Sequence, residues 1–186
     1  MSDPPDTVAD MTLTKYYVAS SIDGFIADTH DRIEWLEQFG FEEFDEHYQA
    51  FLSGIGALVM GATTYEFVLA QGAWPYAEIP TWVVTHRALP TIEGASITFF
   101  AGDVEQLDAE VREAADDRDV WLVGGGALAA QFADRGLIDE LHVTYVPVLV
   151  GSGKPLLPVA EASRPLVLSS SKTFPSGSIE HVYRFA

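Results

Sequence analysis

The stretch that decides the fold is Asp119-Val120-Trp121-Leu122-Val123-Gly124-Gly125-Gly126-Ala127-Leu128, an apolar block that passes through three glycines into a helical pattern. We expect a strand over the apolar block and a helix over residues 127–135. A strand that turns through glycine into a helix leaves the first helical amides unpaired, beside the positive end of the helix dipole. Such a turn can hold an anion such as a phosphate group. On this stretch alone, a tight turn between strand and helix explains the glycines equally well.

The composition indicates a single folded domain. The chain has 186 residues, of which 48% are hydrophobic, and it contains no cysteine, which excludes disulfides and thiol catalysis. We expect a disordered acidic tail over residues 1–12 and one domain over residues 13–186. The tail has neither the basic nor the apolar region of a signal peptide, and no apolar run is long enough to cross a bilayer. These features predict a cytoplasmic protein.

The charge balance limits the partners. Acidic residues number 28 against 10 basic ones, which gives a formal net charge of −18. A field of this sign repels nucleic acid and anionic membranes, so we expect neither as a partner. It also opposes an anionic cofactor, so any phosphate must be held by helix N-termini and by placed cations such as Arg87. A salt-rich cytoplasm is one hypothesis for the acidic excess.

The periodicity predicts an α/β sheet that is parallel in its middle and antiparallel at its C-terminal edge. Strands are expected at residues 13–20, 56–60, 81–85, 95–100 and 119–124, and helices at 41–52, 65–70, 103–117 and 127–135. Three further strands follow at 139–147, 166–173 and 178–185, the last two as a hairpin. A polar loop over residues 28–34 leads to Trp35, while Trp121 is expected in the core.

Three expected strand ends carry turn or phosphate-type residues, at 61–64, 85–87 and 124–126. Ligands of open α/β sheets bind outside the carboxyl ends of the strands, so these segments can converge on one crevice that suits a phosphate-rich ligand. Gly124, Gly126 and Ala129 match only a relaxed form of the dinucleotide fingerprint, and they follow a late strand. A standard Rossmann domain is therefore disfavoured.

Four motifs occur in a recognisable order: Val-Ala-Ser-Ser-Ile-Asp-Gly-Phe-Ile-Ala at 18–27, Met-Gly-Ala-Thr-Thr-Tyr-Glu at 60–66, Val-Gly-Gly-Gly at 123–126, and the segments 136–142 and 147–153. In this order the chain resembles the dihydrofolate reductase-like superfamily over residues 15–185. The last two segments are most similar to the branch related to the reductase domain of the riboflavin-biosynthesis deaminase-reductase. The resemblance implies a three-layer α/β/α fold, NADPH-dependent reduction of a small pteridine- or pyrimidine-like substrate, and a homodimer through the C-terminal strands.

The resemblance also implies a cofactor site. Ala19 and Ile26 match positions that line the nicotinamide. The residues matching the pyrophosphate site lie at a helix start and along the glycine run: Gly61, Thr63, Thr64, Val123, Gly124, Gly125, Gly126, Ala127 and Leu128. The bond that is commonly cis in this superfamily corresponds to Gly124-Gly125. Thr85, His86 and Arg87 match the strand end that reads the adenosine 2′-phosphate, which favours NADPH over NADH.

The catalytic residues follow from the same resemblance. Counting back from Met60 without gaps places Asp45 at the carboxylate that handles the substrate proton, and Thr144 matches the threonine that hydrogen-bonds to it. Trp35 resembles the tryptophan of the loop over the active site. Tyr48 and Phe51 are then expected to flank the substrate ring. A carboxylate in an apolar cleft can have a raised pKa and donate or orient a proton. Asp45 also fits a solvated helix residue, and Thr144 an ordinary strand residue.

The chain departs from the family pattern at three places. Ala62 replaces a frequent arginine, Tyr17 stands where the riboflavin branch usually carries a lysine, and residues 69–71 lack the usual Asp-x-Pro. A riboflavin-pathway substrate is therefore not expected. The alternative to an enzyme is a nucleotide-binding module without turnover, acting as a sensor or structural dimer. Asp45 separates the two hypotheses, because only catalysis requires it. No metal site is expected, since His30 and Glu34 have no third ligand.

Overall fold

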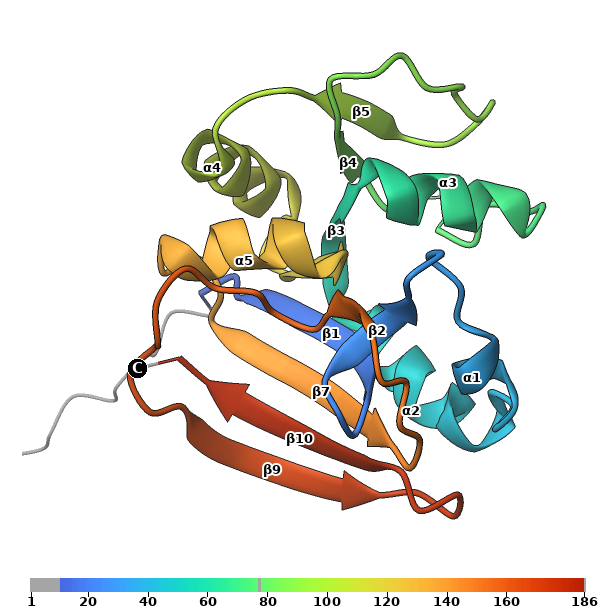
Figure 1. Cartoon of the computed structure of the whole chain (residues 1–186). Helices are drawn as coiled ribbons and strands as arrows, with labels where there is room; N and C mark the ends of the chain where they lie inside the picture. Colours follow the sequence, from blue (N-terminus) through green and yellow to red (C-terminus); the bar gives the residue numbers. More distant parts are fainter. Residues whose placement is uncertain (1–10, 77, 186) are drawn as a thin grey trace, which may run out of the picture.

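The computed structural model describes residues 11–76 and 78–185, which form one sheet-centred domain (Figure 1). The strands of this part of the chain are β1 (Thr14–Ser21), β2 (Phe25–Asp28), β3 (Ile55–Gly61), β4 (Thr81–Val84), β5 (Ile97–Phe100), β6 (Asp119–Gly124), β7 (Glu140–Val146), β8 (Gly153–Pro155), β9 (Val167–Thr173) and β10 (Ile179–Arg184). The helices are α1 (Glu34–Glu37), α2 (Glu42–Ser53), α3 (Ala62–Ala70), α4 (Val104–Ala114) and α5 (Gly126–Asp134). The tail predicted over residues 1–12 lies outside the described residues, except for Met11 and Thr12.

Eight strands form the main sheet in the order β5-β4-β3-β6-β1-β7-β10-β9. Neighbours from β5 to β7 pair in parallel, whereas β10 pairs antiparallel with both β7 and β9. The mixed sheet with an antiparallel C-terminal edge is confirmed. The short strands β2 and β8 form a second, two-stranded sheet that the sequence pattern did not predict.

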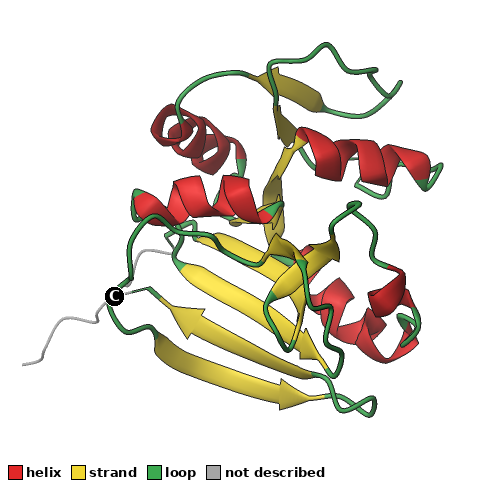
Figure 2. Cartoon of the chain, viewed as in Figure 1, coloured by secondary structure: helices red, strands yellow, loops and turns green. Residues whose placement is uncertain are grey.

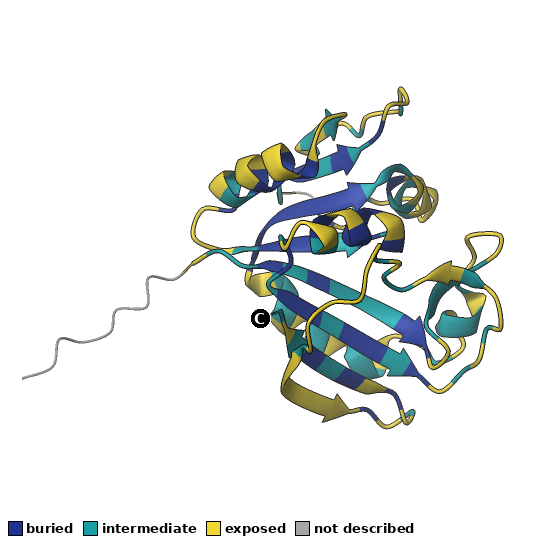
Figure 3. Ribbon diagram, turned by 60° about the vertical axis from the view of Figure 1, so that its left-hand side comes forward, coloured by how far each residue is buried: buried dark blue, intermediate teal, exposed yellow. Residues whose placement is uncertain are grey.

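Helices cover both faces of the sheet, which makes three layers (Figure 2). One core joins α4 and α5 to the central strands through residues such as Leu107, Val111 and Phe132. The other core lies beneath α2 and α3, where Tyr65 and Met60 are buried against Tyr48 and neighbouring aromatics. Burial on both faces explains why β3 is an unbroken apolar run. Figure 3 shows the gradient from buried central strands to edge strand β9, which is exposed at every position.

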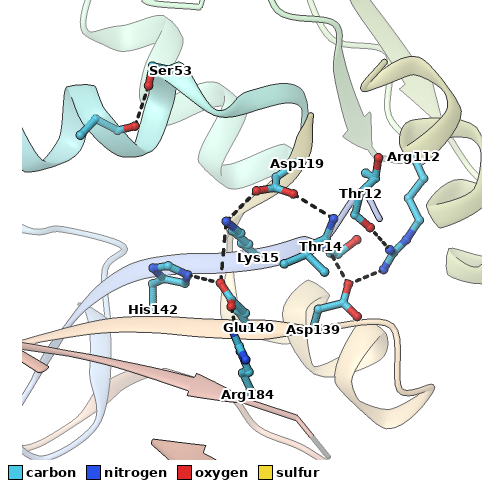
Figure 4. A network of polar contacts seen from close by, with 12 residues as sticks. Thr12, Thr14, Lys15, Ser53, Arg112, Asp119, Asp139, Glu140, His142 and Arg184 are labelled. Carbon is cyan, nitrogen blue, oxygen red and sulfur yellow. Dashed lines mark hydrogen bonds and ion pairs between the residues drawn. The ribbon is translucent and has the colours of Figure 1, made fainter. Parts of the chain in front are cut away.

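A polar network ties together the amino ends of the central strands (Figure 4). Lys15 Nζ lies 2.6 Å from Asp119 Oδ2 and 3.7 Å from Glu140 Oε2, so one cation bridges β1, β6 and β7. His142 and Arg184 also contact the Glu140 carboxylate, at 2.9 and 3.3 Å. These partly buried charges are paired, as burial requires. This network lies at the amino ends of β1, β6 and β7, opposite the carboxyl ends at which ligands of open α/β sheets bind.

One local expectation differs from the structure. Trp35 lies within the one-turn helix α1 rather than at the end of a loop, and the loop expected over residues 28–34 includes the last residue of β2 and the first residue of α1. Helix α4 begins with a capping contact, in which the Asp103 carboxylate accepts a hydrogen bond from the Glu105 amide.

Candidate functional site

The glycine turn at the end of β6 brings the backbone of three segments together. Gly124 has φ +137°, a conformation that side chains disfavour, and the Gly124–Gly125 bond is cis, as the resemblance implies. A Cβ on Gly126 would overlap the backbone carbonyl oxygens of Pro155, the last residue of β8, and of Leu156, which follows it. Glycine is therefore required at position 124 by the backbone conformation and at position 126 by close packing.

Two helices begin next to this turn without a side-chain cap. The N-cap residues are Gly61 for α3 and Gly125 for α5, and neither can supply a capping oxygen. Their strands, β3 and β6, are neighbours in the sheet, so both N-termini lie at the same edge. By contrast, α4 is capped by the Asp103 carboxylate. Two adjacent uncapped N-termini form a site that suits an anion, because their free amides and dipoles act together.

A groove with a volume of about 840 Å³ runs along these N-termini, and we call it the glycine groove. Its wall contains most of the residues predicted to bind a cofactor: Ala19, Ile26, Gly61, Thr63, Thr64, Val123, Gly124, Gly125, Gly126, Ala127 and Leu128. Lys154 also lines the groove and lies 3.4 Å from Asp31, which makes it a cation near the uncapped helices. The volume lies within the range of ligand-binding clefts.

The three residues after β4 lie outside the wall of the glycine groove. Thr85 is buried, and its hydroxyl accepts a hydrogen bond from the Arg87 amide at 2.9 Å, which shapes the turn. His86 is exposed. The Arg87 guanidinium forms a two-point contact with the Glu66 carboxylate, at 3.1 and 2.7 Å, and this contact raises the pKa of Arg87. Arg87 must exchange Glu66 for any phosphate that it binds.

A second cavity, of about 400 Å³, lies between α2 and the sheet, and we call it the aromatic cavity. Asp45, Tyr48 and Thr144, three of the residues to which the resemblance assigns catalytic or substrate-binding roles, line it. Asp45 is exposed and lies 3.4 Å from the Gln49 amide nitrogen. The structure brings Asp45 and Thr144 to one cavity but shows no hydrogen bond between these two described residues.

Trp35 and Phe51 do not line either cavity. The Trp35 indole N–H is buried without a partner among the described residues, while Phe51 stacks on Tyr17 with ring centroids 4.2 Å apart. Phe51 therefore supports a residue of the cavity wall from behind. Trp35 lies in the same short helix as Leu36, which does line the cavities.

The two cavities share part of their wall. The residues common to both are Tyr17, Ala19, Leu36, Phe41, Tyr76 and Trp121. They come from β1, β6, the α1–α2 segment and the loop after α3, which are far apart in the sequence. A ligand in the glycine groove and a ligand in the aromatic cavity would meet at this shared wall.

The sequence analysis missed most of the shared wall, since Ala19 alone among its six residues was a predicted site residue. Trp121 was expected in the core, and it is buried, but one side faces both cavities. Tyr17 was noted only for standing in place of a lysine, although that substitution was a signal that the position faces a ligand. Burial, followed by the charge of Glu180 and by Tyr48, raises the pKa of Tyr17. Its phenol therefore stays protonated and can donate a hydrogen bond.

A buried carboxylate paired with a histidine lies beside the aromatic cavity. Glu180 on β10 is only 3% exposed, and its Oε1 atom lies 2.7 Å from His47 Nε2 on α2. The second oxygen, Oε2, is buried without a partner among the described residues. Glu180 and Ala19 both pair in register with Thr144, so the three side chains project from the same face of the sheet. The sequence pattern gave no sign of this pair.

Other site types lack support in the described part of the chain. Residues 11–76 and 78–185 contain no cluster of three or more histidine, aspartate or glutamate side chains placed to hold a metal ion. Within the same residues, every helix is too short or too polar to cross a bilayer.

The comparisons with known proteins identify the family and the fold. The chain is 30% identical over 162 residues to YwjB of Bacillus subtilis, a protein of uncharacterised activity, with 87% of this chain and 91% of YwjB covered. A protein of Shewanella sp. PV-4 that is named for riboflavin biosynthesis has a similar structure, with a TM-score of 0.82 at 25% identity, over 94% of this chain and 99% of that one.

A more distant structure shows the same fold. It is the diaminohydroxyphosphoribosylaminopyrimidine deaminase and 5-amino-6-(5-phosphoribosylamino)uracil reductase of Thermotoga maritima, with a TM-score of 0.67 at 17% identity. The match covers 95% of this chain and 57% of that protein. The model of the RibD C-terminal domain matches residues 15–179, which is most of the chain. The chain therefore belongs to the RibD C-terminal domain family, whose fold is the dihydrofolate reductase-like fold expected from its motifs.

Proposed function

We propose that this protein is an NADPH-dependent reductase of a small heterocyclic substrate. The observation that carries the proposal is the shared wall of the glycine groove and the aromatic cavity. Hydride transfer requires two ligands in direct contact, and two adjoining cavities with common residues provide that arrangement. Membership of the RibD C-terminal domain family supports the same reaction class, since the similar Thermotoga maritima protein is named as a reductase.

The residues of the glycine groove fit a dinucleotide. The uncapped N-termini of α3 and α5 offer amides for a pyrophosphate, with the hydroxyls of Thr63 and Thr64 beside them. A Cβ on Gly124 or Gly125 would meet only ordinary contacts, with Thr64 Oγ1 at 3.9 Å and Ile26 Cδ1 at 4.0 Å, and both of these neighbours also line the groove. Ala19 belongs to the shared wall, and Ile26 lines the groove. When bound, NADPH supplies the hydride.

The chain's own residues then handle the proton. Reduction of a carbonyl or imine adds the hydride to carbon and a proton to the oxygen or nitrogen. Asp45 lines the aromatic cavity and can supply or orient that proton, while Thr144 projects into the same cavity. Tyr17, at the shared wall, can donate a hydrogen bond to the heteroatom, which stabilises the charge that develops on it.

Two measurements test this proposal. Titration of the intrinsic tryptophan fluorescence with NADPH should quench the signal, because Trp121 lies in the shared wall. NADPH oxidation is then followed with dihydrofolate, pteridines, flavins and pyrimidine precursors such as 5-amino-6-(5-phosphoribosylamino)uracil. We expect turnover with at least one of them, and Asp45→Asn should lower kcat by roughly tenfold or more. Absence of NADPH binding would overturn the proposal.

One observation favours a second candidate, a nucleotide-binding module without turnover. Asp45 is exposed and forms no hydrogen bond with Thr144 within the described residues, so the arrangement expected for proton transfer is not assembled. This candidate predicts NADPH binding that is unaffected by Asp45→Asn and no oxidation with any compound of the panel. The enzyme predicts a loss of turnover in the variant with binding retained.

A further inference from the structure

The aromatic cavity differs from the glycine groove in its charge. Eleven residues line it, and Asp45 is the one charged side chain among them. The remainder are aromatic, aliphatic or hydroxyl-bearing. A phosphate monoester is a dianion that needs arginine, lysine or free backbone amides to replace its hydration. The described wall of this cavity offers no such cation.

The groups behind the wall add negative charge. Glu180 projects from the same cross-strand row as the cavity residue Thr144, and one of its oxygens is unpartnered and buried. The two neighbouring histidines are held by carboxylates: His47 lies 2.7 Å from Glu180, and His142 lies 2.9 Å from Glu140. The surroundings of the cavity therefore oppose an anion rather than attract one.

The aromatic surface of the cavity suits a flat ring. Tyr48 and Trp121 meet edge to face in its wall, with centroids 5.9 Å apart. Phe41 lines both cavities and is 59% exposed, so a ligand would cover an apolar side chain that water now contacts. Burial raises the pKa of Tyr17, Tyr48 and Tyr76, and these phenols can donate hydrogen bonds at neutral pH. Stacking and phenol donors recognise a neutral heterocycle with carbonyl or ring-nitrogen acceptors.

We propose that the aromatic cavity takes a planar heterocycle that carries no phosphate and is neutral or cationic. This inference rests on the proposed function, because it names the substrate class of the same site. Phosphate recognition is confined to the glycine groove, where helix N-termini and Lys154 are available. The substrate thus differs from the phosphoribosyl compound for which the Thermotoga maritima reductase is named.

The test compares compounds that differ only by a phosphate monoester. The two pairs are riboflavin with its 5′-phosphate, and 5-amino-6-(5-phosphoribosylamino)uracil with its dephosphorylated form. Dissociation constants are measured with the full chain, with and without saturating NADPH. We expect the phosphate-free member to bind roughly tenfold or more tightly in at least one pair. Tighter binding of the phosphorylated members, or no binding of either pair, overturns the inference.

Two charge-reversal variants test whether the cavity wall causes the discrimination against phosphate. Asp45→Lys changes the one charged residue of the wall, whereas Glu46→Lys makes the same change in net charge at an exposed neighbour on α2 that lines neither cavity. We expect Asp45→Lys to reduce the discrimination against phosphate severalfold, and Glu46→Lys to leave it near the wild-type value. An equal effect of both variants would mean that net charge, not the cavity, excludes the anion, and would overturn the inference. NADPH binding, measured first, tests the proposed function separately.

Discussion

Gly126 is the residue whose size the fold constrains most directly at the glycine groove. A Cβ there would overlap backbone oxygens of Pro155 and Leu156, which cannot move aside as a side chain can. We predict that Gly126→Ala lowers the free energy of unfolding by about 1–3 kcal/mol, because overpacking forces backbone shifts. Urea unfolding measures the change.

Gly54→Ala is the matched control for Gly126→Ala. The nearest atom to a Cβ on Gly54 is the Phe51 carbonyl oxygen at 3.6 Å, an ordinary contact, and the backbone φ is −86°. We expect this variant to change the free energy of unfolding by less than about 1 kcal/mol. Equal losses in the two variants would contradict the role assigned to Gly126.

Arg87 is the residue on which cofactor preference depends in the proposed function. It is now paired with Glu66, and both side chains are about half exposed, at 56% and 43%. We predict that Glu66→Gln tightens NADPH binding by about two- to fivefold, because the guanidinium no longer exchanges a carboxylate for the phosphate. NADH binding should stay unchanged, since NADH lacks the 2′-phosphate.

Fluorescence titration with both cofactors measures this preference. Arg87→Gln should act in the opposite direction and weaken NADPH alone. Glu110→Gln, on helix α4 on the other side of the sheet, removes one acidic charge at a distance and serves as the control. If Arg87→Gln left the ratio of the two dissociation constants unchanged, the 2′-phosphate would be read elsewhere.

The turn between β1 and β2 is held to the segment before β8 by one carboxylate. The Ser21 hydroxyl donates to Asp23 at 2.6 Å, and the amides of Val150 and Gly151 donate at 3.0 and 2.7 Å. These hydrogen bonds lower the pKa of Asp23 from 3.8 to about 2. A lowered pKa means that the charged form stabilises the fold, and that this stabilisation is lost as the pH falls from about 4 to about 2.

The Asp23→Asn variant tests that linkage. At pH 6 it should be less stable than the wild type, because the amide is a weaker acceptor than the carboxylate. The difference in unfolding free energy should shrink as the pH falls from about 4 to about 2. Urea unfolding at several pH values follows it, and a difference that stays constant across this range would refute the assignment.

Strand β9 is an edge of the main sheet with which a strand of another chain can pair. It is exposed at all seven positions, and Val167 and Leu168 are 57% and 52% exposed. Exposed apolar edges are commonly covered by another chain. We predict a homodimer through β9, and Leu168→Lys should shift the molecule to the monomer in light scattering coupled to size exclusion. Ser170→Lys, with the same charge change at a non-apolar position of β9, should shift it less; a monomeric wild type would contradict the prediction.

At the scale of the whole molecule, the charge of −18 opposes the compact state. Salt screens this repulsion, so we predict that the unfolding temperature rises between low and about 1 M potassium chloride. Screening that restores about 1 kcal/mol corresponds to roughly 2–4 °C for a chain of this size. The increase should disappear near pH 4.3, the isoelectric point, where no net repulsion remains. A midpoint that does not rise at pH 7 would also count against the hypothesis of a salt-rich cytoplasm.

The central elements could be predicted because their patterns are strong over several residues. Strand β7 alternates and is long, and β6 ends in the glycine run that begins α5. The short helix α1 and the short strand β8 could not be predicted as such, since four and three residues carry too little periodicity. Strands β2 and β8 exist through their pairing with each other, which joins segments more than 120 residues apart.

The sequence by itself determined the order of the main elements, the family motifs and the glycine turn between β6 and α5, because these depend on local pattern and on backbone freedom. Only the tertiary structure decided which side chains form the shared wall and where negative charge gathers around the aromatic cavity. Tyr17 and Trp121 come together because β1 pairs with β6, and Glu180 lies beside the cavity because β10 pairs with β7. Such neighbours are set by long-range strand order, which no local pattern encodes.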